Sequence, residues 1–171
     1  MPLFLSSPAH MKKHMKAEFI NPFLHAAKNV LETMAQTPVT PGKPYLKKGR
    51  SSYGEVTGII GMTSDTVSGS MIVSFSRKCI LKIVANMLME EPKSAIDDEV
   101  IDAVGELTNM ICGGAKAQLA KTEYRFDLAI PSMVVGKSVD LDCYTDAPTI
   151  VIPFSTKNGP FVVEANLRQR Q

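Results

Sequence analysis

Residues 97–119 read DDEVIDAVGELTNMICGGAKAQL, a segment that combines a helical apolar stripe with an unusual polar face. Its apolar side chains recur at the three- and four-residue spacing of an amphipathic helix: Val100, Val104, Leu107 and Ile111. The opposite face carries two carboxylates, an amide and a glycine, each about one turn from the next: Asp102, Glu106, Asn109 and Gly113. We therefore predict a helix from about Asp97 to Lys121, whose outer face suits close docking against another surface.

Two adjacent glycines, Gly113 and Gly114, fall inside this predicted helix. A glycine in a helix interior costs roughly 0.5–1 kcal/mol relative to alanine. Close packing or the close approach of another surface is the usual compensation, so the pair indicates an element or a partner pressed against the helix.

The whole chain has the composition of an ordinary globular protein, with 171 residues, of which 44% are hydrophobic and 21% charged. Its formal net charge of +2 gives no indication of nucleic-acid binding. The apolar runs are shorter than the roughly 20 residues that a membrane span needs, so we expect no membrane contact. We expect residues 15–171 to form a single domain, and residues 1–14 to be disordered or partly a cloning remnant.

The cysteines indicate a reducing compartment. Cys79, Cys112 and Cys143 are far apart, form no CxxC pair and show no metal-ligand spacing with the histidines. Buried free thiols in the cytoplasm are the simplest interpretation, and we expect no metal and no cofactor bound by this chain.

The elements before residue 97 are predicted from periodicity and turn signals. A helix over 17–36 is expected to begin near Asn21, because Pro22 suits a first helical turn. Residues 37–50 are rich in proline and lysine and are predicted to be an extended or loop connection. Strands over 54–62 and 69–75 form a predicted hairpin, and Ser76 caps a helix over 77–89.

The remainder is strand-like. Four strands are predicted, over residues 126–135, 138–144, 149–155 and 161–167. Pro131 inside the first of these implies an edge, a bulge or a bend, and Asn158-Gly159 is a strong hairpin signal. The order of elements predicts an α+β fold, with helices packed on a mostly antiparallel sheet.

Several kinds of catalytic site are disfavoured by context. His10, His14 and His25 are not beside a serine or cysteine in a nucleophile motif, which argues against a triad. The glycines over 54–61 are spaced like a phosphate loop but lie in a strand that does not lead into a helix. Glu106 and Asn109 remain as candidates, although ExxN on a helix is a weak signal by itself.

The segment 97–119 closely resembles the signature helix of the CheC/CheX/FliY chemotaxis phosphatases, and that of the CheX branch most of all. The motif matches at Asp102, Glu106, Asn109 and, about a residue early, Pro131. The predicted hairpin and the segment LAIPSMVVG over 128–136 also resemble the family, so that the likeness covers about residues 17–167. It implies the CheC-like two-layer fold. CheC-like members carry the motif twice, but the N-terminal helix here has Glu32 followed by Ala35 instead of asparagine, which implies a single active helix.

The resemblance also implies a function and partners. The family substrate is the phosphoaspartate of a CheY-like response regulator, which itself supplies Mg²⁺ and a lysine. The resemblance implies that Asn109 orients the attacking water and that Glu106 pairs with the regulator's lysine. Partner contacts are expected from Asp102, Gly113 and Lys116. The resemblance further implies a homodimer joined through the edges of its sheets.

Two other interpretations stay open. A CheX-like or flagellar-switch-like domain could bind a response regulator without hydrolysing anything, although such a binder has no need to keep the Asn109 amide. The other is a purely structural dimeric domain, in which the helix face that carries Glu106 and Asn109 (the ExxN face) meets solvent. The sequence does not identify the regulator, its output or a CheD-like accessory partner.

Overall fold

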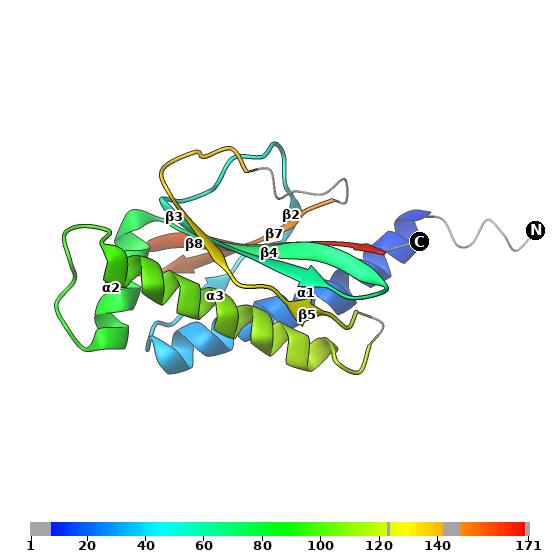
Figure 1. The fold of residues 1–171 in the computed structure, drawn as a ribbon, viewed down its shortest axis with the longest axis horizontal. Helices are drawn as coiled ribbons and strands as arrows, with labels where there is room; N and C mark the ends of the chain where they lie inside the picture. Colours follow the sequence, from blue (N-terminus) through cyan, green and yellow to red (C-terminus); the bar gives the residue numbers. More distant parts are fainter. Residues whose placement is uncertain (1–7, 123, 142–147, 170–171) are drawn as a thin grey trace, which may run out of the picture.

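The computed structural model describes residues 8–122, 124–141 and 148–169 (Figure 1). Its three helices are α1 (Pro8–Met34), α2 (Arg77–Leu88) and α3 (Asp98–Leu119). The first strands are β1 (Thr40–Pro41), β2 (Tyr45–Leu46), β3 (Val56–Thr63) and β4 (Val67–Phe75). The later strands are β5 (Asp127–Leu128), β6 (Ser132–Val135), β7 (Ile150–Thr156) and β8 (Gly159–Gln169). None of the helices described is long and apolar enough to cross a membrane.

The strands form one antiparallel sheet in the order β1-β7-β8-β4-β3-β5, while β2 also pairs with β7 and β6 also pairs with β3. Helices α1 and α3 lie together on one side of this sheet (Figure 1). The core fills the space between them and contains fully buried residues from both layers, including Phe23, Leu107, Ile60, Phe75 and Phe161. This arrangement confirms the predicted α+β fold with helices packed on an antiparallel sheet.

The predicted start of the first helix is wrong. Helix α1 begins at Pro8 and continues through Pro22, so residues 8–14 are helical where we expected disorder. Residues 1–7 lie outside the described part of the chain. A proline inside a helix removes one backbone hydrogen bond. The burial of Phe19, Ile20 and Phe23 on both sides of Pro22 compensates for this loss.

The predicted strand over 126–135 is divided into β5 and β6, as the proline signal indicated. The predicted strand over 138–144 does not form over 138–141, where a single bridge joins Ser51 and Asp140. Positive φ angles at Gly136 (144°) and Ser138 (51°) turn the chain out of the sheet there. Residues 142–144 lie outside the described residues.

The hairpin between β7 and β8 is confirmed, with its turn one residue earlier than predicted. Thr156 pairs with Gly159, so Lys157 and Asn158 form the loop. Gly159 has a φ of 122°, a conformation that favours glycine. Ser76 occupies the N-cap position of α2, but its hydroxyl donates instead to the Pro160 carbonyl at 2.6 Å and ties the helix to this hairpin.

Candidate functional site

Helix α3 begins at a well-formed cap. The Asp97 carboxylate accepts a hydrogen bond from the Val100 backbone N–H at 3.0 Å, and Asp98 and Glu99 occupy the first turn. Lys93 donates to Asp97 at 2.7 Å, and this bond, together with the Val100 bond, lowers the pKa of the Asp97 carboxyl. The cap therefore fixes the start of the helix and the rotation of the face that follows.

The two faces of α3 are as different as the sequence predicts. Its apolar stripe is fully buried: Val100, Val104, Leu107 and Ile111. Asp102, Glu106 and Asn109 are exposed, and Gly113 is half-buried one turn further on. The helix thus presents a carboxylate and an amide, three residues apart, on a surface that a macromolecule can reach.

Close contacts on both flanks fix the orientation of this face. On strand β3, a methyl group added at Gly58 would lie 2.0 Å from Thr108 Oγ1. On helix α1, a methyl group added at Gly114 would lie 3.1 Å from Ala26 Cβ. Because Thr108 immediately precedes Asn109, the contact at Gly58 determines how far the amide stands from the sheet.

The two adjacent glycines therefore have different surroundings. Gly114 allows the close approach of α1, which is one of the compensations that the sequence indicates. Around Gly113, none of the described heavy atoms outside its own stretch of helix lies within 4 Å of an added methyl group. This open space lies beside the exposed face, where an approaching surface could use it.

Strands β5 and β6 flank the same face, a feature that the sequence did not reveal. A methyl group added at Gly105 would lie 3.2 Å from Met133 Cε, and Lys116 Nζ lies 3.4 Å from Asp127 Oδ1. Between these two contacts, Ile130 is 89% exposed. The exposed ExxN face is thus bordered by a strand segment that follows it in sequence.

The N-terminal helix does not repeat the pairing of glutamate and asparagine at Glu32 and Ala35. Glu32 is exposed on α1 and lies 3.5 Å from Lys28, whereas Ala35, three residues on, is fully buried just past the end of the helix. The Ala35 methyl group belongs to the core and has no polar function.

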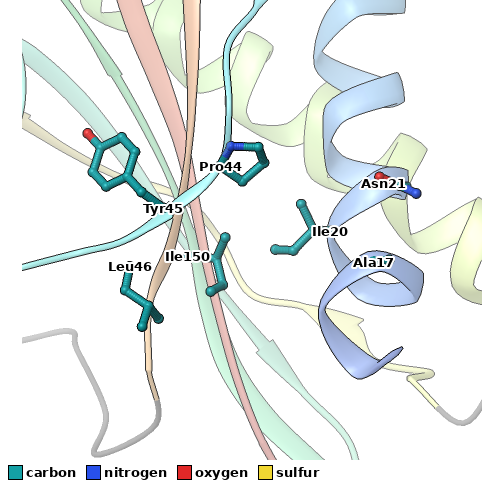
Figure 2. A pocket seen from close by; sticks show the side chains of 7 residues that line it. All are labelled: Ala17, Ile20, Asn21, Pro44, Tyr45, Leu46 and Ile150. Carbon is teal, nitrogen blue, oxygen red and sulfur yellow. The ribbon is translucent and has the colours of Figure 1, made fainter. Parts of the chain in front are cut away.

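Three hollows in the described part of the surface are lined by residues other than Glu106 and Asn109. A groove of about 400 Å³ runs between α1 and the edge formed by β2 and the start of β7 (Figure 2). Its apolar lining includes Ile20, Tyr45, Leu46 and Ile150. A smaller hollow of about 250 Å³ at the end of α3 includes Lys116 and Asp127. The open position of the ExxN face suits a protein substrate better than a small molecule, which usually binds in a concave pocket.

The chemistry of the described residues is limited. Among them, no group of three His, Cys, Asp or Glu side chains could hold a metal ion. Burial raises the pKa of the Cys79 thiol to about 11 and that of the Cys112 thiol to about 12, so both stay protonated at neutral pH. Cys143 lies outside the described residues. What α3 can supply is hydrogen bonding from Asn109 and negative charge from Glu106.

Comparisons with known proteins agree on one family. Residues 56–155 match the model of the family described as chemotaxis phosphatase CheX. The crystal structure of the chemotaxis protein CheX from Vibrio vulnificus is 40% identical, with a TM-score of 0.82, and the match covers 88% of this chain and 99% of that one. A protein from Thermotoga maritima named CheY-P phosphatase CheX is 25% identical over 130 residues, which are 76% of this chain and 83% of that protein.

A third relative was solved with its partner. The structure of the CheX–CheY–BeF₃–Mg²⁺ complex from Borrelia burgdorferi is 26% identical to this chain, with a TM-score of 0.74, and the match covers 88% of this chain and 97% of that one. The family match spans more than half of the chain, and the Vibrio relative is more than 30% identical over most of its length. This protein therefore belongs to the CheX family of chemotaxis phosphatases.

Proposed function

We propose that this protein hydrolyses the phosphoaspartate of a CheY-like response regulator, with Asn109 positioning the attacking water and Glu106 binding the regulator. The observation that carries the proposal is the pairing of these two exposed side chains on one rigid face of α3. The Borrelia relative, solved with CheY, BeF₃ and Mg²⁺, supports a regulator as the partner.

The reaction requires little from this chain beyond positioning. Water oxygen forms a bond to phosphorus while the bond from phosphorus to the aspartyl oxygen breaks, and the electron pair remains on the aspartate carboxylate. The protons of the water go to phosphate and solvent. Charge on the phosphoryl oxygens is stabilised by Mg²⁺ and lysine, which the regulator supplies in this proposal.

Asn109 suits the positioning role because its side chain is neutral and bifunctional. Its carbonyl can accept a hydrogen bond from the water, and its NH₂ group can donate to a phosphoryl oxygen. A carboxylate at the same place would repel the phosphoryl group. Orientation of the reactants can lower such barriers by several kcal/mol, with roughly 7–11 kcal/mol as the upper range.

Glu106 and the three partner-binding residues then determine docking. Glu106 lies one turn before Asn109, where its carboxylate can pair with the regulator's lysine. Gly113 leaves room for the partner backbone, and Asp102 extends the acidic part of the face. Lys116 is held beside this face by Asp127, so in this proposal it contacts the regulator from the end of α3.

The quaternary state completes the proposal. A homodimer that joins sheets edge to edge would use the β1/β2 edge, where Tyr45 is 48% exposed and Leu46 is 50% exposed. Both residues also line the groove beside α1 (Figure 2), so a second strand there would cover apolar surface. This edge lies at the opposite end of the sheet from β5 and β6, so the ExxN face of each copy would remain free.

The principal test is the decay of phosphorylated regulators from the same source, measured with wild-type protein and with Asn109→Ala. We expect the variant to lose at least about a hundredfold in stimulated decay, by analogy with the removal of other single catalytic hydrogen-bonding groups. It should keep most of its affinity for the beryllofluoride-activated regulator. Asn29→Ala is the matched control, since Asn29 is an exposed asparagine on α1. Normal decay with Asn109→Ala would refute its role.

A second measurement tests the docking role of Glu106. Glu106→Lys should weaken binding to the activated regulator by about tenfold or more and lower turnover, because it places like charges together. Glu32→Lys on α1 is the charge-matched control. An unchanged affinity of Glu106→Lys would exclude the ion pair. A protein that binds the regulator tightly but never accelerates its decay would instead be the non-catalytic binding module.

A further inference from the structure

The segment that flanks the α3 face contains a β-bulge. Leu128 pairs with Met62, and the Ala129 N–H donates to the Gly61 carbonyl, but the next pair along is Ser132 with Ile59. Ile130 and Pro131 therefore stand together opposite one residue, Ile60. Such an insertion bends the strand and redirects side chains, and it occurs often next to functional sites.

The bulge lies level with the middle of the ExxN face. On one side of the bulge Met133 contacts α3 at Gly105, and on the other Asp127 contacts it at Lys116. The stretch of helix between these two contacts carries Asn109 and Gly113. Ile60, which the bulge faces, is fully buried, and the contacts of Met133 and Asp127 place the segment on either side of the bulge beside α3.

Ile130 is exposed, but the backbone on either side of it is restricted. Its side chain is 89% exposed, which for one isolated isoleucine needs no explanation. Here, however, Pro131 restricts the backbone of Ile130, and the hydrogen bond from Ala129 to Gly61 anchors the preceding residue. Because the backbone around Ile130 is already fixed, binding there would order one side chain and no backbone, which favours its use as an anchor.

We propose that Ile130 is a docking residue for the phosphorylated response regulator. Its side chain packs against apolar surface of the regulator next to the phosphoaspartate, while Asn109 and Glu106 make the polar contacts. This inference rests on the proposed function and adds a specificity determinant to it. Ile130 acts on binding and not on the chemical step. Regulators that carry a charged residue at the matching position are expected to be poor substrates.

The experiment measures KM and kcat for stimulated decay, together with the Kd for the beryllofluoride-activated regulator, using Ile130→Ala and Ile130→Asp. We expect Ile130→Ala to raise KM and Kd by about tenfold, and Ile130→Asp to raise them further, while kcat stays within about twofold. Met89→Ala and Met89→Asp are the matched controls, because Met89 is 87% exposed at the end of α2. Both controls should behave as wild type.

The possible outcomes separate this inference from the proposed function. In one outcome, wild type and the Met89 variants accelerate decay, and Ile130→Asp does so with an unchanged KM. Ile130 then has no docking role, and the proposed function stands. A loss of kcat at constant KM would also overturn the docking role. A change of the Ile130 variants from dimer to monomer, measured by light scattering, would assign Ile130 to contact with a second copy. If wild type itself has no effect on any regulator, the proposed function fails and this inference with it.

Discussion

At the scale of single residues, the exposed face of α3 depends on the missing side chain at Gly113 as much as on the polar side chains of Asn109 and Glu106. Two neighbouring glycines look equivalent in the sequence, but Gly114 lies against Ala26 and Gly113 faces open space among the described residues. A helix keeps a costly glycine at an open position when another surface needs the room. Gly113 is therefore a residue at which stability and activity are expected to conflict.

Gly113→Ala should make this conflict measurable. The free energy of unfolding should rise by roughly 0.5–1 kcal/mol, because alanine is the better helix former and meets no described neighbour. Affinity for the activated regulator should fall, because the new methyl group projects from the docking face. Thermal melts and regulator binding measure the two effects. Gly114→Ala, whose methyl group meets Ala26 at 3.1 Å, should show no such gain in stability. A stabilised Gly113→Ala with full affinity would remove clearance as the reason for the glycine.

At the scale of elements, the contact between α3 and β3 positions the site. Thr108 Oγ1 donates to the Val104 carbonyl at 2.6 Å and stands directly over Gly58. A β-branched side chain in a helix has few rotamers, so Thr108 cannot easily turn away from a larger neighbour. The absence of a side chain at Gly58 therefore allows the helix to lie where Asn109 faces outward beside the β5–β6 segment.

Gly58→Ala is expected to push α3 away from the sheet. The added methyl group would lie 2.0 Å from Thr108 Oγ1, so we expect a loss of roughly 1–3 kcal/mol in the free energy of unfolding and a decline in regulator dephosphorylation. Gly61→Ala on the same strand is the control, because its nearest described neighbour, Ala129 Cβ, is at an ordinary 3.5 Å. Equal melting temperatures for the two variants would mean that the helix adapts and that the contact is not decisive.

At the scale of the whole molecule, the two edges of the sheet have different surroundings. The β5–β6 edge borders the α3 face, whereas the β1/β2 edge is remote from it and leaves Tyr45 and Leu46 half-exposed. An uncovered edge with apolar side chains is prone to pair with another chain. Assembly through β2 would give a dimer with two independent catalytic faces.

The double variant Tyr45→Lys/Leu46→Lys is expected to be monomeric at concentrations where wild type is dimeric, because it brings like charges together at the joined edges. Light scattering coupled to size-exclusion chromatography measures the mass. Regulator dephosphorylation per chain should remain within about twofold of wild type, since α3 does not take part in the proposed joint. Met89→Lys controls for an added surface charge. A wild-type monomer, or a variant that remains dimeric, would contradict this assignment of the edge.

Helix α3 and its two faces can be predicted from the sequence alone, because a helix repeats over a few residues and its periodicity is local. The family was indicated separately, by the resemblance of residues 97–119 to the signature helix of the CheX branch. The sequence also predicted the β3–β4 and β7–β8 hairpins, whose strands are joined by short turns. It misplaced the start of α1, because propensity assigned Pro22 to a first turn whereas burial of the residues around it sustains a longer helix. The strand predicted over 138–141 did not form for a different reason, because the local backbone turns at Gly136 and Ser138 direct the chain out of the sheet.

Long-range contacts determine which segments lie next to the ExxN face. The Ile130–Pro131 bulge and the Met133 contact at Gly105 depend on the pairing of β3 with β5 and β6, and the position of Thr108 over Gly58 depends on the packing of α3 on β3. Strand register and helix-on-sheet distance arise from such long-range contacts, and a shift of one residue changes which side chains face the helix. Local periodicity therefore locates Glu106 and Asn109, and the assembled sheet determines which surface a partner meets beside them.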